Sequence, residues 1–144
     1  MLGVFYYDLN DTQRSFYHYS LSYKSIEDTT DIAMQAYIQI GLATIHARQK
    51  SYKRAEELFQ ITATMSKVND LWLVESRAHY ELGMLKMLQK QYAASEEKIQ
   101  ISYEIRRDNG AVPAMLSSMI GLVELLIVQK IYTRAESILK EALI

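Results

Sequence analysis

A 40-residue repeat constrains the fold of this chain more than any other feature of its sequence. Three tyrosines recur at this interval: Tyr52, Tyr92 and Tyr132. Three positions after each tyrosine stands a small residue: Ala55, Ser95 and Ala135. A fixed period of about 20 to 50 residues is typical of proteins in which short structural units stack side by side. The repetition therefore predicts an array of stacked units.

The composition predicts that these units are helical. The 144 residues include one proline and five glycines, and few segments alternate in the manner of β-strands. In the last three copies we expect six helices. Four are at about 31–49, 51–67, 71–89 and 91–107. The fifth has Pro113 in its first turn and ends near residue 129, and the sixth runs from residue 132 to the C-terminus. In the first copy we expect one helix that ends near Tyr23 or Lys24.

Polar residues mark the expected ends of these helices. Thr29 or Thr30 is expected to cap the helix that begins near residue 31, and Asn10 or Asp11 is expected to cap the helix of the first copy. The tripeptide Asp108-Asn109-Gly110 predicts a turn, because glycine and asparagine tolerate the left-handed backbone conformation at a helix end.

Two sets of small residues predict where the paired helices cross. The first set consists of glycines preceded by leucine or isoleucine: Gly41, Gly83 and Gly121. The second set is the small residue that follows each repeated tyrosine. We expect both sets to let the helices of one unit approach closely, because larger side chains would hold them apart. Four residues after the second set, apolar side chains are expected to fill the space between units: Phe59, Ile99 and Leu139.

Charge and composition exclude several classes of protein. With 16 basic and 17 acidic residues the chain has no general attraction to polyanions, so we expect no binding to nucleic acid. The absence of cysteine excludes disulfides and thiolate metal sites. The N-terminus does not read as a secretory signal, and the longest apolar run, 119–128, is too short to cross a bilayer. We therefore expect a cytoplasmic location without membrane contact.

With Leu or Ile before Gly, then Tyr, a small residue and an apolar residue at fixed offsets, the chain resembles the tetratricopeptide repeat family, in a subclass with a 40-residue period. The resemblance covers the whole chain. It implies an all-α fold, a right-handed superhelix of antiparallel helix pairs with about three and a half repeats. We expect one domain over 1–144, with repeats at approximately 1–29, 30–70, 71–110 and 111–144, cut from a longer chain.

A narrower resemblance is carried by the segments VFYYDLNDTQRSFYHYSLSYKSI and SYKRAEELF. They are similar to the repeat region of the Bacillus Rap regulators, which are response-regulator aspartate phosphatases controlled by peptide pheromones. The resemblance implies a bacterial signalling regulator that binds a short peptide inside the superhelix. In that family the phosphatase residues belong to an N-terminal helical bundle that we do not expect in this chain. We therefore expect no enzymatic activity from the chain itself.

The candidate binding residues lie on the leading helix of each pair, since leading helices line the concave surface of such a stack. Amide and guanidinium groups can bond a peptide backbone or carboxylate, and methionine adapts to apolar anchors. Counted from each glycine, the residues predicted to bind a peptide or protein segment are Gln35, Gln39, Leu42, His46, Arg77, Tyr80, Glu81, Met84, Met115, Ser118 and Met119. Further inward positions are Ile38, Ile45, Met87, Leu122 and Leu125. The competing interpretation for the methionines is ordinary core packing.

The sequence also allows functions other than peptide binding. The chain could be a structural or oligomerisation spacer with no ligand, and its uncapped terminal repeats could pair in a homodimer. Catalysis has little support, because His18, His46 and His79 lie on different repeats without metal-ligand spacing. No nucleophile elbow, phosphate loop or HExxH sequence is present. We therefore expect no metal and no cofactor.

Overall fold

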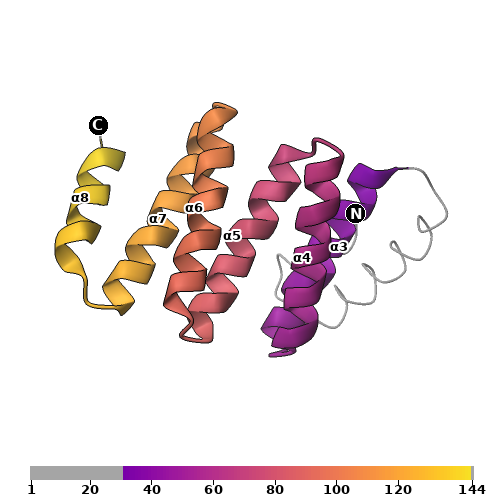
Figure 1. Cartoon of the computed structure of the whole chain (residues 1–144), viewed down its shortest axis with the longest axis horizontal. Helices are drawn as coiled ribbons and strands as arrows, with labels where there is room; N and C mark the ends of the chain where they lie inside the picture. The colour runs from indigo at the N-terminus through magenta and orange to yellow at the C-terminus, as the bar shows by residue number, and fades with distance from the viewer. Residues whose placement is uncertain (1–30, 144) are drawn as a thin grey trace. The chain divides into compact units, whose positions relative to one another are not determined.

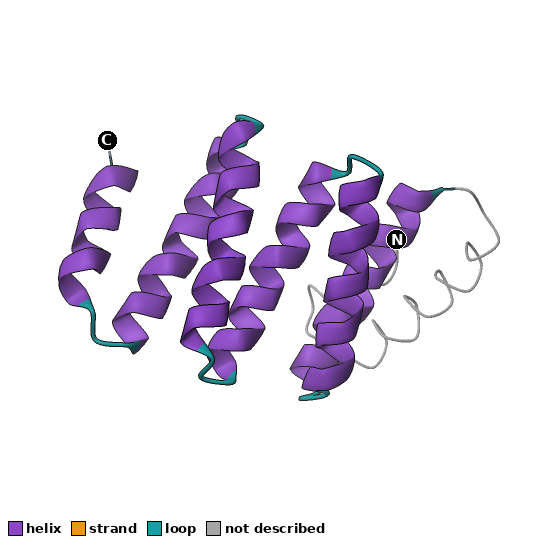
Figure 2. Cartoon of the chain, viewed as in Figure 1, coloured by secondary structure: helices purple, strands orange, loops and turns teal. Residues whose placement is uncertain are grey.

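The computed structural model describes residues 31–143, and the regular secondary structure of this part of the chain is entirely helical (Figures 1 and 2). The helices are α3 (Ile32–Arg48), α4 (Tyr52–Val68), α5 (Trp72–Leu88), α6 (Tyr92–Asp108), α7 (Val112–Val128) and α8 (Tyr132–Ala142). The six helices predicted for the last three copies are thereby confirmed. The helix expected in the first copy lies outside the described residues.

Each of the five connections between these helices has the same backbone geometry. In the first, Lys50 has a φ of 63°. The N–H of Lys50 donates to the carbonyl of Ala47 at 3.0 Å, and the N–H of Ser51 donates to the carbonyl of His46 at 2.8 Å. This pair of bonds is the Schellman motif, which satisfies the last carbonyls of a helix and stops it. The same pair recurs around four further residues with positive φ: Asp70, Lys90, Gly110 and Lys130.

The turn predicted at Asp108-Asn109-Gly110 is confirmed, since Gly110 has a φ of 68°. The predicted cap of the helix that begins near residue 31 is wrong. The N-cap of α3 is Asp31, whose carboxylate accepts a hydrogen bond from the N–H of Met34 at 3.0 Å. A carboxylate at this position also interacts favourably with the positive end of the helix dipole.

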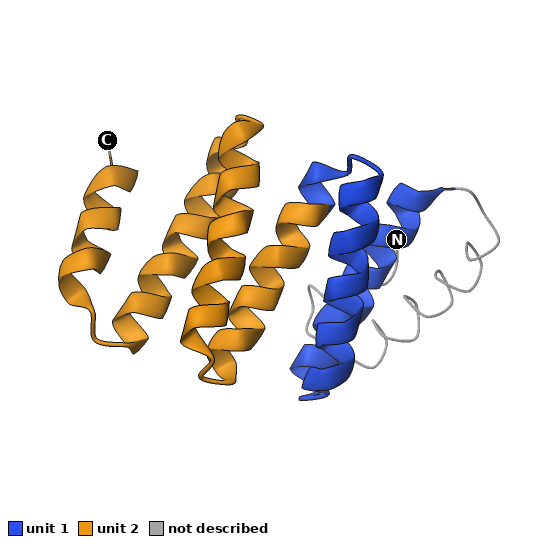
Figure 3. Cartoon of the chain, viewed as in Figure 1, with its two compact units in different colours: residues 1–74 blue, residues 75–144 orange. Residues whose placement is uncertain are grey.

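The chain divides into two compact units, residues 1–74 and residues 75–144 (Figure 3). The boundary falls in the first turn of α5. Unit 1 contains the described helices α3 and α4, and unit 2 contains most of α5 together with α6, α7 and α8. The expectation of one domain with four repeat boundaries stays a prediction.

In unit 1, α3 and α4 form an antiparallel pair with an apolar core and one polar bridge. Ile38 and Ile45 of α3 are buried, as are Ala55 and Phe59 of α4. These isoleucines are therefore core residues and do not face a groove. A buried hydroxyl also joins the two helices, because Thr62 of α4 donates to the side-chain oxygen of a glutamine on α3.

In unit 2, α5 and α6 approach closely at Gly83. A Cβ atom on Gly83 would overlap the Ile99 side chain and would lie 3.1 Å from the carbonyl oxygen of Ser95. The Ser95 hydroxyl donates to the carbonyl of Gly83 at 2.7 Å. The predicted crossing of a glycine with a small residue of the second helix is therefore confirmed for this pair.

Gly121 has a different contact from the one predicted. Its nearest neighbours are Tyr80 of α5 and Ile99 of α6, not residues of α8. The residues of α7 that cluster with Ala135 of α8 are Val123 and Leu126, and Val123 lies 40 residues after Gly83 in the sequence. The glycines therefore mark two kinds of contact, one within a helix pair and one between a pair and the next.

The apolar residues expected between units also divide into two groups. Phe59 and Ile99 are buried, and Ile99 lies near both Gly83 and Gly121, as expected for a side chain that fills the space between pairs. Leu139 is 43% exposed, so the prediction for this residue is wrong. Within the described residues, the outer side of α8 has no helix packed over Leu139.

Candidate functional site

The predicted binding residues of α3 are buried or half-buried. Gln39 is buried, and its Oε1 accepts a hydrogen bond from the Thr62 hydroxyl at 3.0 Å. Gln35, Leu42 and His46 are half-buried. Burial lowers the pKa of His46, and the nearby positive charge of Arg54 lowers it further. Gln39 therefore has a structural contact inside unit 1.

The predicted binding residues of α7 are mostly turned inward. Ser118 and Met119 are buried, as are the further positions Leu122 and Leu125, and Met115 is half-buried. These side chains belong to the interior of unit 2. The expectation that Ser118 and Met119 lie on an open groove is therefore wrong.

The error has a simple cause in the helical register. The prediction counted from Gly83 and Gly121, which are 38 residues apart, whereas α5 and α7 begin 40 residues apart. A shift of two residues rotates a position by about 200° around a helix, which moves it to the opposite face. Counting from the repeated tyrosines would have given the correct register.

When α5 and α7 are aligned by their first residues, four of the inward residues predicted on α5 have exposed equivalents on α7. Arg77 is exposed, and Tyr80, Glu81, Met84 and Met87 are half-buried. The equivalents of Arg77, Tyr80, Met84 and Met87 on α7 are Ser117, Ile120, Glu124 and Ile127, and all four are exposed. We call these eight residues the α5–α7 face: Arg77, Tyr80, Met84, Met87, Ser117, Ile120, Glu124 and Ile127.

Contacts of Tyr80 join the two helices of the α5–α7 face. A Cβ on Gly121 would lie 2.9 Å from Tyr80 Cε2, so the tyrosine ring rests against the backbone of α7. Burial raises the pKa of Tyr80, the negative charges of Glu124 and Glu81 raise it further, and Arg106 opposes them. The Tyr80 hydroxyl therefore stays protonated at neutral pH and can donate a hydrogen bond.

Arg106 of α6 lies beneath this tyrosine and was not among the predicted site residues. Its side chain is only 7% exposed. Its Nε donates to the Ser76 hydroxyl at 3.2 Å, and its Nη1 donates to the Ala114 carbonyl at 3.0 Å and to the Ser118 hydroxyl at 2.8 Å. Its guanidinium carbon lies 5.3 Å from the centre of the Tyr80 ring. One cation therefore connects α5, α6 and α7.

The charge of Arg106 is buried among neutral hydrogen-bond acceptors. Burial lowers its pKa, Tyr80 and Glu81 raise it, and the positive charge of Arg77 lowers it. Because the guanidinium stays charged in proteins, its desolvation must be offset by hydrogen bonds and by attraction to negative groups. The three neutral oxygens fix the position of the guanidinium without neutralising it.

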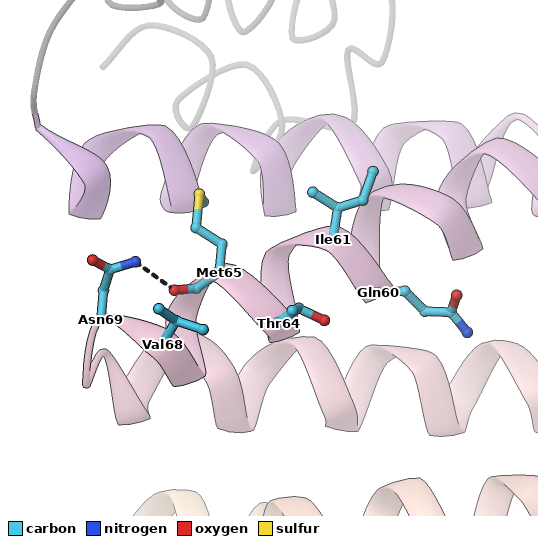
Figure 4. Close-up of a pocket in the computed structure, with 6 residues that line it drawn as sticks. All are labelled: Gln60, Ile61, Thr64, Met65, Val68 and Asn69. Carbon is cyan, nitrogen blue, oxygen red and sulfur yellow. Dashed lines mark hydrogen bonds between the residues drawn. The ribbon is translucent and has the colours of Figure 1, made fainter.

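Hollows of the described residues lie outside the α5–α7 face. One, of about 530 Å³, follows α4 in unit 1 and is lined by five residues of that helix and by its C-cap Asn69 (Figure 4): Gln60, Ile61, Thr64, Met65, Val68 and Asn69. Another, of about 320 Å³, lies among α6, α7 and α8 in unit 2. Met119 lines this second hollow, on the side of the trailing helices.

Among residues 31–143, no group of three or more His, Asp or Glu side chains is placed to hold a metal ion. In the same part of the chain, no helix is long and apolar enough to cross a membrane. The α5–α7 face offers apolar side chains, two hydroxyls, one guanidinium and one carboxylate. Apolar side chains with a few polar groups are common in ligand sites.

Solved structures that are similar to this chain are helical-repeat proteins. The apo form of RapI has a TM-score of 0.86 and 17% sequence identity, and the match covers 97% of this chain and 51% of the RapI chain. Aspartyl phosphate phosphatase F from Bacillus subtilis has a TM-score of 0.91 and 15% sequence identity, and the match covers 98% of this chain and 37% of the phosphatase chain. A putative kinesin light chain from P. anserina with TPR-like repeats has a TM-score of 0.79 and 15% sequence identity, and the match covers 98% of this chain and 69% of the kinesin light chain.

These similarities show the fold. The chain is an all-α repeat of the tetratricopeptide-like type, as the sequence predicts. It spans about half of RapI and little more than a third of phosphatase F. No protein-family model and no curated protein matches the sequence. The binding residues must therefore be argued from the structure of this chain.

Proposed function

We propose that this chain is a protein-binding repeat module that holds a peptide segment of another protein on the α5–α7 face. The observation that supports this most is the exposure of apolar residues at equivalent positions of two leading helices. Ile120 is 53% exposed and Ile127 is 48% exposed, and Tyr80 and Met87 are half-buried at the matching positions of α5. Met84, between them on α5, is also half-buried. Apolar side chains gathered on one surface favour an interaction site over chance exposure.

The polar members of the face suit recognition of a peptide backbone. Tyr80 has a protonated hydroxyl beside the apolar residues, and Arg77 and Ser117 lie about one turn earlier on their helices. A few polar groups fix the orientation of a ligand, while apolar contacts supply most of its affinity. Glu81, half-buried next to Tyr80, belongs to the same surface. In unit 1, Gln35, Leu42 and His46 stay predicted contacts.

The similar structures support a more specific form of this proposal. Aspartyl phosphate phosphatase F is named as a phosphatase, and both it and RapI share the tetratricopeptide-like fold with this chain. We infer a bacterial, cytoplasmic signalling regulator in which the bound peptide is the signal. The catalytic step of such a regulator is not assigned to any residue of this chain.

A second candidate function is self-association through α8. Leu139 and Leu143 are 43% and 85% exposed, and the neighbouring Tyr132 is also exposed. An exposed apolar surface can pair with its own copy in a symmetric dimer. In this case the chain would act as an oligomerisation spacer, and the α5–α7 face would have no ligand.

Selection from a displayed library of short random peptides on the full chain tests the peptide proposal. We expect enriched peptides with shared apolar anchors that bind saturably at one site. Light scattering over a range of chain concentrations tests the spacer alternative. Selection without any saturable peptide, combined with dimer formation that a Leu139→Asp variant abolishes, would reject the peptide proposal in favour of the spacer.

A further inference from the structure

The connection between α6 and α7 contains the dipeptide Asn109-Gly110, and both residues are exposed. Asparagine before glycine is chemically labile, because glycine has no side chain that keeps its backbone nitrogen away from the asparagine amide. In this reaction the Gly110 nitrogen bonds to Cγ of Asn109. Its proton passes through water to the side-chain nitrogen, which leaves as ammonia. Water then opens the succinimide ring, and residue 109 becomes aspartate or isoaspartate.

The geometry of the folded turn opposes this reaction. Asn109 has a ψ of 7°, so the Gly110 nitrogen nearly eclipses the backbone nitrogen of Asn109 and points away from Cβ. Ring closure therefore needs a large rotation. Both reacting groups are also hydrogen-bonded: the N–H of Gly110 donates to the Arg107 carbonyl at 3.0 Å, and Nδ2 of Asn109 donates to the Ile105 carbonyl at 2.8 Å. The turn must open before the ring can close.

We propose that Asn109 is a site of spontaneous deamidation and that opening of the turn between α6 and α7 sets its rate. A carboxylate at position 109 cannot donate to the Ile105 carbonyl, and it places a negative charge at the negative end of the α6 dipole. Isoaspartate lengthens the backbone by one carbon, which displaces the N–H groups of Gly110 and Ala111 from the two bonds that close α6. Deamidation therefore turns a transient opening into a lasting one.

Asn69 is a matched position in the same chain, 40 residues before Asn109. It is the exposed C-cap of α4, with a ψ of 15°, and its Nδ2 donates to the Met65 carbonyl at 2.8 Å. The main difference is the next residue, Asp70, whose side chain hinders the approach of its own backbone nitrogen. We therefore expect Asn69 to react more slowly than Asn109 wherever both turns are open.

Mass spectrometry of the full chain tests the site. The chain is incubated at mildly alkaline pH in buffer and in concentrated urea, and is then digested at acidic pH. Both asparagines are assayed for the mass gain of deamidation and for isoaspartate. We expect Asn109 to react at least about tenfold faster in urea, because unfolding releases the Gly110 nitrogen from the turn. Asn69 should react more slowly than Asn109 in urea.

Two substitutions test whether the turn sets the rate in the folded chain. Arg106→Ala removes the hydrogen bonds that hold α6 to Ala114 and Ser118 of α7, so it should speed deamidation in buffer. Arg107→Ala is the control, because this neighbouring side chain is exposed, and it should leave the rate unchanged. Both variants keep the Asn-Gly dipeptide intact.

Four results would overturn the proposal. Asn109 could keep its amide in urea, or it could react equally fast in buffer and in urea. Asn69 could react as fast as Asn109 in urea. A folded Arg106→Ala variant could react no faster than Arg107→Ala. The comparison between buffer and urea needs no substitution, so it decides the question even where Arg106→Ala does not fold.

Discussion

Tyr80 and Gly121 are in direct contact between α5 and α7. A Cβ on Gly121 would lie 2.9 Å from Cε2 of Tyr80 and 3.6 Å from its hydroxyl oxygen. Contacts under about 3 Å between carbon atoms do not occur in packed interiors, so the ring can lie here only because residue 121 has no side chain. This contact holds the Tyr80 ring of the proposed binding face against the backbone of α7.

The substitution Gly121→Ala is expected to destabilise unit 2 by about 1–3 kcal/mol, because the added methyl overpacks against the Tyr80 ring. The higher helix propensity of alanine, about 1 kcal/mol, opposes this loss. In a Tyr80→Ala background the clash is absent, so the same substitution should stabilise the chain. Urea denaturation of the four proteins in this cycle measures the difference. Equal effects of Gly121→Ala in both backgrounds would contradict the contact.

Lys90 is expected to be a strained residue. It has a φ of 60° in the turn between α5 and α6, where a side chain costs about 1–2 kcal/mol and glycine costs little. Lys90→Gly should therefore raise the free energy of unfolding by up to about 1 kcal/mol. Lys98→Gly, in the middle of α6, is the matched control and should lower it by about 1 kcal/mol. Thermal denaturation that shows a loss for both variants would disprove the role of the turn geometry.

Arg106→Ala is expected to be among the most destabilising substitutions in unit 2. The substitution leaves a cavity and removes the hydrogen bonds that Arg106 donates to Ser76, Ala114 and Ser118. We expect it to lower the free energy of unfolding by about 2–5 kcal/mol. Arg107→Ala, the neighbouring control, removes an exposed side chain that pairs with Asp108 and should have little effect. Chemical denaturation compares the two variants. Similar losses would mean that Arg106 does not connect the three helices.

The lowered pKa of His46 predicts that the stability of the folded chain depends on pH. Its pKa is lowered in the folded chain by burial and by Arg54, so the unfolded chain binds a proton more readily. The stabilising contribution of neutral His46 is therefore present above pH 6.5 and decreases as the pH falls from 6.5 toward the lowered pKa. His46→Gln should reduce the slope of stability against pH in this interval. A slope that is unchanged in denaturation experiments at several pH values would refute the assignment.

The fold could be predicted well from the sequence because its signals are local. Each helix is bounded by a turn at a fixed interval, and the predicted ends agree with the observed ends to within about two residues. Lys50, Lys90 and Lys130 adopt the left-handed conformation without the usual glycine or asparagine. Residue type marks the turns at Gly110 and at Asn69-Asp70, because glycine, asparagine and aspartate tolerate this conformation. The turns at the three lysines follow from periodicity, since lysine carries no such signal.

The binding face was only partly predictable, because its register depends on packing between helices. Gly83 and Gly121 look equivalent in the sequence, but one accommodates α6 and the other accommodates Tyr80 of α5. A glycine shows that something approaches closely and does not show from which side. Arg106 was missed for a similar reason. It reads as a charged residue at a helix end, and its burial arises from Ser76 and Ser118 on other helices.

The affinity of a selected peptide for two matched variants tests the central claim most directly. Ile120 of the α5–α7 face and Ile61 of α4 are both 53% exposed on helices, so aspartate at either position should perturb folding similarly. We predict that Ile120→Asp weakens binding at least about tenfold, because it buries a charge under an apolar anchor, while Ile61→Asp binds like the unmodified chain. Unchanged affinity in Ile120→Asp, or a loss confined to Ile61→Asp, would contradict the assignment of the peptide site to the α5–α7 face.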